Sequence, residues 1–200
     1  MSSDTAVVIL AAGAGSRWSG EGHKLSATLP ATATEPPATV IERALAHAIS
    51  AALGPVIVIT GAAPDIVPTV LTVSNHQVTV SHNPRWAEGQ MTSLRAGLDA
   101  ATELDCCAVV VGLADQPFIT PAAWRTVAAC DAPIAVATYD GRRGNPVRLD
   151  SAVWTLLPAN GDEGARSLMR VRPDLVREVP CSGSPADIDT EEDLRRWQNS

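Results

Sequence analysis

The chain has 200 residues, an apolar fraction of 46% and a formal net charge of −7, and its mean hydropathy is +0.08. This size predicts one domain spanning residues 1–200, with a sizeable buried core. The acidic balance, with no Lys/Arg cluster larger than a pair, argues against a nucleic-acid partner. No uncharged run reaches the roughly 18 residues of a membrane-spanning helix, and Asp4 stands where a signal peptide carries basic residues. We therefore expect a cytoplasmic protein without a membrane partner.

The first motif joins an apolar run at residues 7–10 to the small residues 11–15. The run is typical of a buried strand. The small residues expose main-chain N–H groups, which attract anions. Arg17 and Lys24 then add positive charge. This pattern favours a triphosphate-binding loop, and a simple chain turn is the alternative.

Two common phosphate-binding motifs fail on spacing. A P-loop requires Gly-Lys-Ser/Thr, whereas Lys24 lies between His23 and Leu25. A dinucleotide fingerprint requires a third glycine where Trp18 stands, and this large side chain would prevent close helix–strand packing. The loop therefore belongs to neither class.

Strand-like and helical segments alternate along the rest of the chain. We expect helices at 40–53 and 91–98 and another beginning at 120–121, and strands at 56–60, 78–80, 108–113 and 134–137. Residues 139–142 predict a turn, and 146–149 a returning antiparallel or edge strand. Residues 190–193 resemble a capping box that opens a last helix, and 31–38 read as a flexible surface loop. This order favours an α/β fold with a mostly parallel central sheet and helices on both faces.

Two acidic positions are candidate metal ligands. Asp115 follows the strand at 108–113, and in open α/β sheets the carboxyl ends of the strands line the ligand crevice. A carboxylate there suits Mg²⁺ bound to phosphate oxygens, although Asp115 also suits a turn cap before Pro117. Asp189 either caps the last helix or shares one Mg²⁺ with Asp115.

Further segments carry polar groups that suit a substrate. Residues 83–93 place small and hydroxyl side chains at a helix start, either against a base edge or as ordinary N-caps. Residues 141–146 place two cations and an amide in a turn, where they suit a second anionic substrate, and 161–166 begin another helix nearby. Other reactive side chains are read as structural: reduced core or near-core thiols at Cys106, Cys107, Cys130 and Cys181, and structural or surface histidines at His23, His47, His76 and His82.

Taken together, these motifs resemble the MobA-like nucleotidyltransferases, and most closely their molybdenum cofactor cytidylyltransferase (MocA-like) branch. The matching segments are LAAGAGSR at 10–17 with Lys24, 83–98, LADQP at 113–117, GRRGNPV at 141–147, 161–168 and DIDTEEDL at 187–194. They follow the family's order and span nearly the whole chain. The resemblance implies a Rossmann-like, three-layer α/β/α nucleotidyltransferase fold. It also implies transfer of CMP from CTP, the favoured nucleotide, to molybdopterin-bound molybdenum cofactor, with release of pyrophosphate.

The resemblance also assigns roles to residues. Arg17, Lys24 and Asp115 are the implied catalytic residues, and Asp115 and Asp189 the implied Mg²⁺ ligands. Arg143, Asn145 and Arg166 are implied to bind the molybdopterin-type acceptor. The implied nucleotide-binding residues are Leu10, Ala11, Ala12, Gly13, Gly15, Arg17, Lys24, Gly89 and Ser93.

The chain departs from the family pattern near the loop. Trp18 stands where the family usually has Met, residues 26–38 lack the usual Leu-Pro-x-Gly-x-Pro-Leu pattern, and Ala114 replaces a glycine. Three alternatives therefore stay open. The first is a guanylyltransferase, and the second is a nucleotidyltransferase with another phosphorylated acceptor. The third is a non-catalytic, cofactor-binding accessory protein of a client molybdoenzyme.

Overall fold

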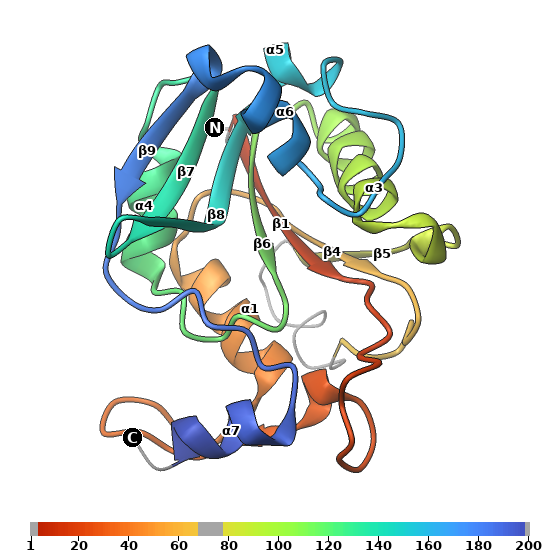
Figure 1. The fold of residues 1–200 in the computed structure, drawn as a ribbon, viewed down its shortest axis with the longest axis vertical. Helices are drawn as coiled ribbons and strands as arrows, with labels where there is room; N and C mark the ends of the chain where they lie inside the picture. Colours follow the sequence, from red (N-terminus) through yellow and green to blue (C-terminus); the bar gives the residue numbers. More distant parts are fainter. Residues whose placement is uncertain (1–3, 68–77, 199–200) are drawn as a thin grey trace.

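The computed structural model describes residues 4–67 and 78–198 and is built around one large sheet (Figure 1). Its strand order is β5-β4-β1-β6-β8-β7-β9. Only β8 runs antiparallel to its neighbours, which confirms the mostly parallel sheet. The strands are β1 (Thr5–Ala11), β4 (Val56–Thr60), β5 (Val78–His82), β6 (Ala108–Leu113), β7 (Ile134–Tyr139), β8 (Arg142–Asp150) and β9 (Val176–Pro180).

Helices cover both faces of the sheet and complete three layers (Figure 1). On one face α1 (Val40–Ser50) and α4 (Pro121–Ala128) pack against the sheet. On the other face lie α3 (Gln90–Glu103), α5 (Ser151–Trp154) and α6 (Arg166–Val171). Among the described residues, no helix is long and apolar enough to cross a membrane. The smaller elements are η1 (Lys24–Ser26), β2 (Thr28–Leu29), β3 (Ala38–Thr39), η2 (Trp86–Glu88), η3 (Pro173–Leu175) and α7 (Glu191–Gln198).

Local capping fixes where several helices begin. Thr39 and Glu42 form a reciprocal capping box at α1, and Thr120 accepts a hydrogen bond from Ala123 N at the start of α4. At α7, Thr190 Oγ1 accepts from Asp193 N, and Asp193 Oδ2 accepts from Thr190 N at 2.9 Å. Each side chain satisfies a main-chain N–H that lacks a partner within the helix. The capping box expected at residues 190–193 is confirmed.

Strand β8 differs from the sequence-based expectation in length and position. It begins at Arg142, directly after a tight turn in which Asp140 and Gly141 have φ of 49° and 76°. It lies between β6 and β7, so the antiparallel alternative is right and the edge alternative is wrong. Pro146 is tolerated inside the sheet because the pairing with β7 is irregular there and the pairing with β6 begins at Val147. Arg143 therefore projects from a strand and not from a turn.

The segment at 31–38 is a surface loop, as expected, but it is anchored at its end. Ala38 belongs to β3, which pairs with β2. Glu35 forms an ion pair with Arg43 and a hydrogen bond with His47, and Arg43 Nη2 donates to Pro36 O at 2.6 Å. Glu35 thus ties the loop to α1.

The four cysteines are free thiols, as expected, but not all are near the core. Cys106 is buried, whereas Cys107 is exposed because it precedes β6 at the edge of the core. His23 and His47 make structural contacts with main-chain atoms of neighbouring segments. His76 lies outside the described residues.

Candidate active site

Parallel pairing of β1 with β6 brings the first loop beside Asp115. Leu10 is in register with Leu113, and Ala114 N donates to Leu10 O at 3.0 Å. Both strands end at the same edge, where the sheet opens its ligand crevice. The carboxy-terminal segment reaches the same place because Ile188 N donates to Asp115 O at 2.8 Å. Residues far apart in the sequence thus meet at one point.

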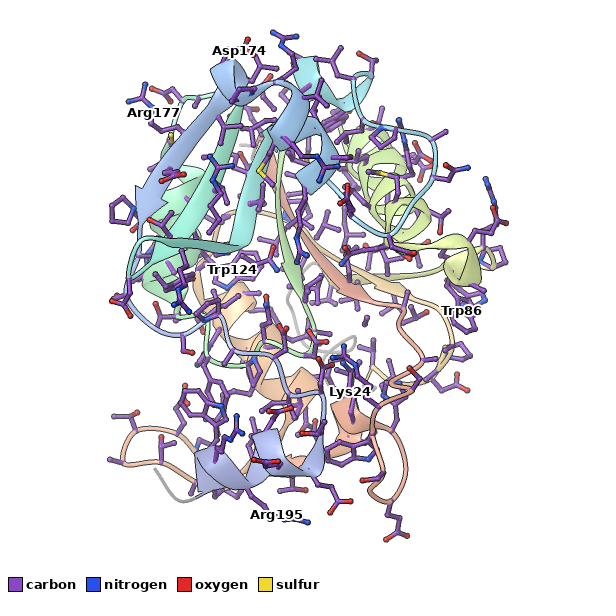
Figure 2. All side chains as sticks on the ribbon, viewed as in Figure 1. Lys24, Trp86, Trp124, Asp174, Arg177 and Arg195 are labelled. Atoms are coloured by element: carbon purple, nitrogen blue, oxygen red, sulfur yellow. The ribbon has the colours of Figure 1, made fainter. Side chains whose placement is uncertain are left out.

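Four charged side chains form a charged cluster at this point, which we define as Arg17, Lys24, Asp115 and Asp189. Lys24 Nζ lies 2.6 Å from Asp115 Oδ2 and 2.6 Å from Asp189 Oδ1. Arg17 Nη2 lies 2.8 Å from Asp189 Oδ2, with its side chain largely exposed. Figure 2 places Lys24 below the carboxyl ends of the central strands. The structure therefore brings together all the residues expected to be catalytic or metal-ligating.

The surroundings keep Lys24 charged. Burial alone would lower the pKa of Lys24, but the Asp115 and Asp189 carboxylates together outweigh it, so the pKa is raised above its ordinary value. Lys24 is therefore a fixed positive charge at neutral pH. It balances two carboxylates that would otherwise repel each other.

The cluster also fits a magnesium ion. Asp115 Oδ1 is buried and has no hydrogen-bond partner among the described residues. Among the described residues, no three or more His, Cys, Asp or Glu side chains are grouped so that they could hold a metal ion by themselves. Mg²⁺ commonly uses only one or two carboxylates, because substrate phosphates and water supply the remaining oxygens. Asp115 and Asp189 are therefore a suitable donor pair.

A first cleft, of about 320 Å³, lies against the loop that follows β1. Of the residues expected to bind nucleotide, it is lined by Leu10, Ala12, Gly13, Gly89 and Ser93, together with Asp115. Ala11, by contrast, places its side chain in the core. Gly15, Arg17 and Lys24 lie outside this lining, on the side of the charged cluster. We name this space the nucleotide cleft after the residues that the sequence predicted to bind nucleotide.

Gly89 has to be a glycine to shape this cleft. Its φ is +112°, a conformation that side-chain-bearing residues rarely adopt. A Cβ atom at this position would lie 2.6 Å from Asp162 Oδ1 and 2.7 Å from Gly161 O. Residues 161–162 therefore pack directly on the start of α3.

Asn83 organises the hydroxyl groups at the same helix start. It is buried, and its Nδ2 donates to Thr92 Oγ1 at 2.9 Å and to Ser93 Oγ at 3.0 Å. The N-cap of α3 is Gly89, with no side-chain cap, so Thr92 and Ser93 are not ordinary N-caps. Sequence reasoning missed this role of Asn83, although Asn83 opens the motif that was singled out.

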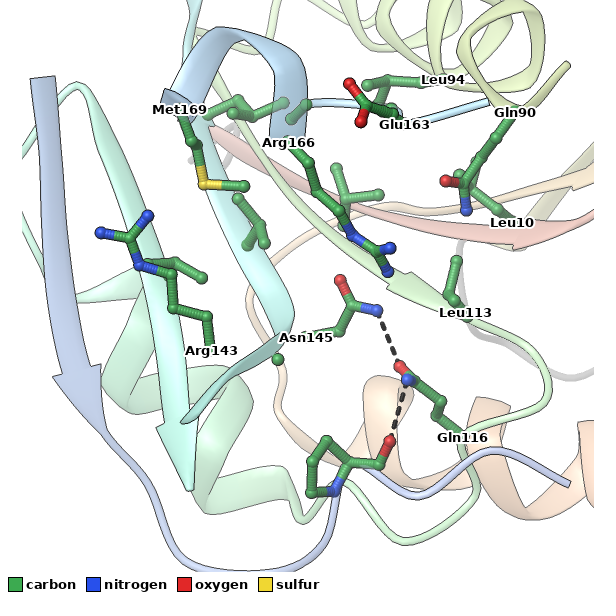
Figure 3. Close-up of a pocket in the computed structure, with 18 of the residues that line it drawn as sticks. Leu10, Gln90, Leu94, Leu113, Gln116, Arg143, Asn145, Glu163, Arg166 and Met169 are labelled. Atoms are coloured by element: carbon green, nitrogen blue, oxygen red, sulfur yellow. Dashed lines mark hydrogen bonds between the residues drawn. The ribbon is translucent and has the colours of Figure 1, made fainter. Parts of the chain in front are cut away.

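A second, larger cleft of about 650 Å³ adjoins the first (Figure 3). It contains all three residues expected to bind the acceptor, namely Arg143, Asn145 and Arg166. The two clefts share Leu10, Gln90 and Leu113 as lining residues. We name the larger space the acceptor cleft after the residues that were predicted to bind the acceptor.

Two further polar residues line the acceptor cleft, although the sequence did not predict either of them as an acceptor-binding residue. Gln116 belongs to the LADQP motif at 113–117, and Asp187 begins the DIDTEEDL motif at 187–194. Partial desolvation, followed by the nearby Asp115 carboxylate, raises the pKa of Asp187, and the hydrogen bond from Gln116 opposes that rise. Gln116, Asn145 and Asp187 thus bring polar groups to this cleft from three separate segments of the chain.

The structure thus combines a charged cluster with two adjoining clefts at the carboxyl edge of an α/β sheet. Comparison with known proteins gives the class a name. Residues 7–178 match the MobA-like NTP transferase domain, so the chain belongs to this family of nucleotidyltransferases.

Individual relatives cover the chain almost completely. It is 30% identical to nicotine blue oxidoreductase of Paenarthrobacter nicotinovorans, over 94% of each chain. The crystal structure of Rv0371c from Mycobacterium tuberculosis H37Rv superposes with a TM-score of 0.79, at 28% identity and with 100% of each chain covered. A structure of Rv0371c in complex with manganese gives a TM-score of 0.74 at 26% identity, again over 100% of each chain. These likenesses confirm the expected nucleotidyltransferase fold.

Proposed function

We propose that the protein transfers CMP from CTP to the phosphate of a molybdopterin-type molybdenum cofactor and releases pyrophosphate. The observation that carries this proposal is the position of Asp115 in the wall of the nucleotide cleft, directly before Gln116 of the adjoining acceptor cleft and with Lys24 and Arg17 in the same charged cluster. One cleft suits the nucleoside and the other a second substrate. The resemblance to the MocA-like branch supplies the choice of CTP and of the acceptor.

The reaction joins the two substrates through one phosphorus atom. An oxygen of the acceptor phosphate attacks the α-phosphorus, a new P–O bond forms, and the bond from the α-phosphorus to the bridging oxygen breaks as pyrophosphate leaves. The acceptor phosphate is already ionised at neutral pH, so the site needs no strong general base. Lys24 and Arg17 bind the triphosphate oxygens and stabilise the negative charge on the departing pyrophosphate.

Asp115 and Asp189 would hold Mg²⁺ in this reaction. When bound, the ion would neutralise negative charge on the triphosphate oxygens. The buried, unpartnered Asp115 Oδ1 supports this assignment. The manganese complex of the related Rv0371c supports a divalent-cation site in this fold.

Release of pyrophosphate tests the proposal. Purified protein is incubated with each of the four nucleoside triphosphates, Mg²⁺ and molybdopterin-bound cofactor. CTP should react fastest, and Asp115→Asn should lower kcat by about 100-fold or more. The matched control is Asp99→Asn, which removes the same charge from an exposed position on α3. Full turnover by Asp115→Asn would rule out the metal assignment.

The same assay separates the remaining alternatives. A preference for GTP indicates a guanylyltransferase. Activity with another phosphorylated compound, and none with molybdopterin, indicates that the acceptor is that other compound. Tight cofactor binding without any pyrophosphate release indicates an accessory protein of a client molybdoenzyme.

A second candidate function comes from the curated relative. Its 30% identity over nearly the full length favours testing the chain as an oxidoreductase that acts on nicotine blue or a similar aromatic compound. Against this candidate, Trp18 replaces the third glycine of a dinucleotide-binding fingerprint. Incubation with nicotine blue and a reduced nicotinamide decides it, because loss of the dye's visible absorbance is expected only from a reductase.

A further inference from the structure

A chain of three polar side chains crosses the floor of the acceptor cleft. Gln116 Nε2 donates to Pro185 O at 2.9 Å and to Asp187 Oδ1 at 2.5 Å. Asn145 Nδ2 donates to Gln116 Oε1 at 2.8 Å. Figure 3 shows the two amides in line, from Asn145 on β8 to Gln116 beyond the end of β6. We define Asp187, Gln116 and Asn145 as the amide chain.

Chemistry allows only one orientation of Gln116 in this chain. Pro185 O is a carbonyl oxygen and can only accept, and Asp187 Oδ1 also accepts from Gln116 in this structure. The –NH₂ end of Gln116 must therefore face both of them. A reversed amide would place its oxygen against two acceptors, and Gln116 is 7% exposed, so little water could compensate. The carbonyl oxygen of Gln116 is thus fixed toward Asn145.

The fixed oxygen of Gln116 determines how Asn145 meets a ligand. Gln116 Oε1 requires a donor, so Asn145 turns its –NH₂ group toward it. The carbonyl oxygen Asn145 Oδ1 is left to face the cleft, which Arg166 also lines (Figure 3). The cleft wall therefore presents both a hydrogen-bond acceptor and a cationic donor.

We propose that Gln116 is a positioning residue that fixes Asn145 Oδ1 toward the acceptor cleft, so that the acceptor substrate must offer a hydrogen-bond donor there. The matching ligand carries an N–H group for Asn145 Oδ1 and a carbonyl or anionic oxygen that Arg166 binds. The inference rests on the proposed function of this cleft as the acceptor site.

Kinetics separate positioning from general packing. Gln116→Leu releases the Asn145 amide and should raise the KM for the molybdopterin acceptor about tenfold, the effect of one lost hydrogen bond. The KM for CTP and the kcat at saturating acceptor should stay within about twofold.

A double-mutant cycle shows whether Gln116 acts through Asn145. In an Asn145→Leu background, Gln116→Leu should change the acceptor KM by less than about twofold, because the group being positioned is already gone. Independent, multiplying effects of the two substitutions would overturn the proposal. So would an unchanged acceptor KM in Gln116→Leu.

A measurement without substrates keeps this inference separate from the proposed function. In ¹³C,¹⁵N-labelled wild-type protein, couplings across hydrogen bonds are recorded by NMR for the side-chain amides. We expect a coupling from Asn145 Nδ2 to the side-chain carbonyl carbon of Gln116. A coupling from Gln116 Nε2 to the Asn145 carbonyl carbon, or none between the two amides, overturns the inference whether or not the protein transfers nucleotides. If the couplings agree but no acceptor reacts, the proposed function fails and the amide chain stands.

Discussion

Replacing Lys24 with Met should destabilise the folded protein strongly, because it leaves Asp115 and Asp189 without their shared cation. Removing one partner of a buried ion pair costs about 3–5 kcal/mol. The side chains of Lys24, Asp115 and Asp189 are 10%, 19% and 16% exposed. Since solvent reaches the carboxylates in part, we expect the lower end, about 3 kcal/mol. For a chain of this length that corresponds to a loss of roughly 6–12 °C in Tm.

Urea unfolding at neutral pH with a chelator present measures this effect. The matched control is Arg172→Met, which removes a cation from the exposed ion pair with Asp174 and should leave the unfolding midpoint unchanged. Mg²⁺ or Mn²⁺ should then stabilise Lys24→Met, by about 2.7 kcal/mol at one hundred times the Kd, because the ion takes the place of the missing charge. Wild-type stability in the Lys24→Met variant would refute the claim that Lys24 neutralises the two carboxylates.

Three further variants or conditions test other parts of the site. Gly89→Ala should lower stability by about 2–3 kcal/mol in urea unfolding and weaken nucleotide binding, because its Cβ would collide with Asp162. Gly13→Ala, which meets nothing within 4 Å, is the control for stability, and an equal loss of stability in the two variants would contradict the argument. Asn83→Ala should cost about 2–3 kcal/mol by thermal unfolding, since it leaves two buried hydroxyl groups without their donor; a loss below about 0.5 kcal/mol would show that these bonds contribute little. The pKa of Lys24 is raised above 10.5, so its stabilising effect should be complete below that pH and disappear as the pH rises through the folded-state pKa. Unfolding of wild type and Lys24→Met across the alkaline range measures this, and a difference that already vanishes below pH 10.5 would contradict the sign.

The sequence was most informative where local pattern and topology agree. The apolar runs of β1 and β6 and the small or acidic residues that follow them predicted parallel strands with a shared ligand edge. Asp115 lies beside the loop after β1 because β1 and β6 pair in parallel and end at the same edge of the sheet. The sequence pattern singled out Arg17 and Lys24 as cations near the loop and Asp189 as one of two acidic candidates, the resemblance to the family gave them roles, and the structure places them within one cluster.

The features that were missed depend on contacts between distant segments. The inner position of β8 is set by pairing on both sides, which periodicity within residues 142–150 does not reveal. Glu35 sits in a segment with loop-like composition, and only its contacts with α1 show that it is anchored. Gln116 and Asp187 are 71 positions apart, so no local pattern links the amide to the carboxylate.

The central claim is that the two clefts join a nucleotide to an acceptor through the α-phosphorus. CTP labelled with ³²P at the α position, and separately at the γ position, is incubated with the protein, Mg²⁺ and the molybdopterin acceptor, and the products are separated. The α label should appear in the acceptor product and the γ label in pyrophosphate. Transfer of the γ label to the acceptor, or no labelled acceptor product with any nucleoside triphosphate, would contradict the account.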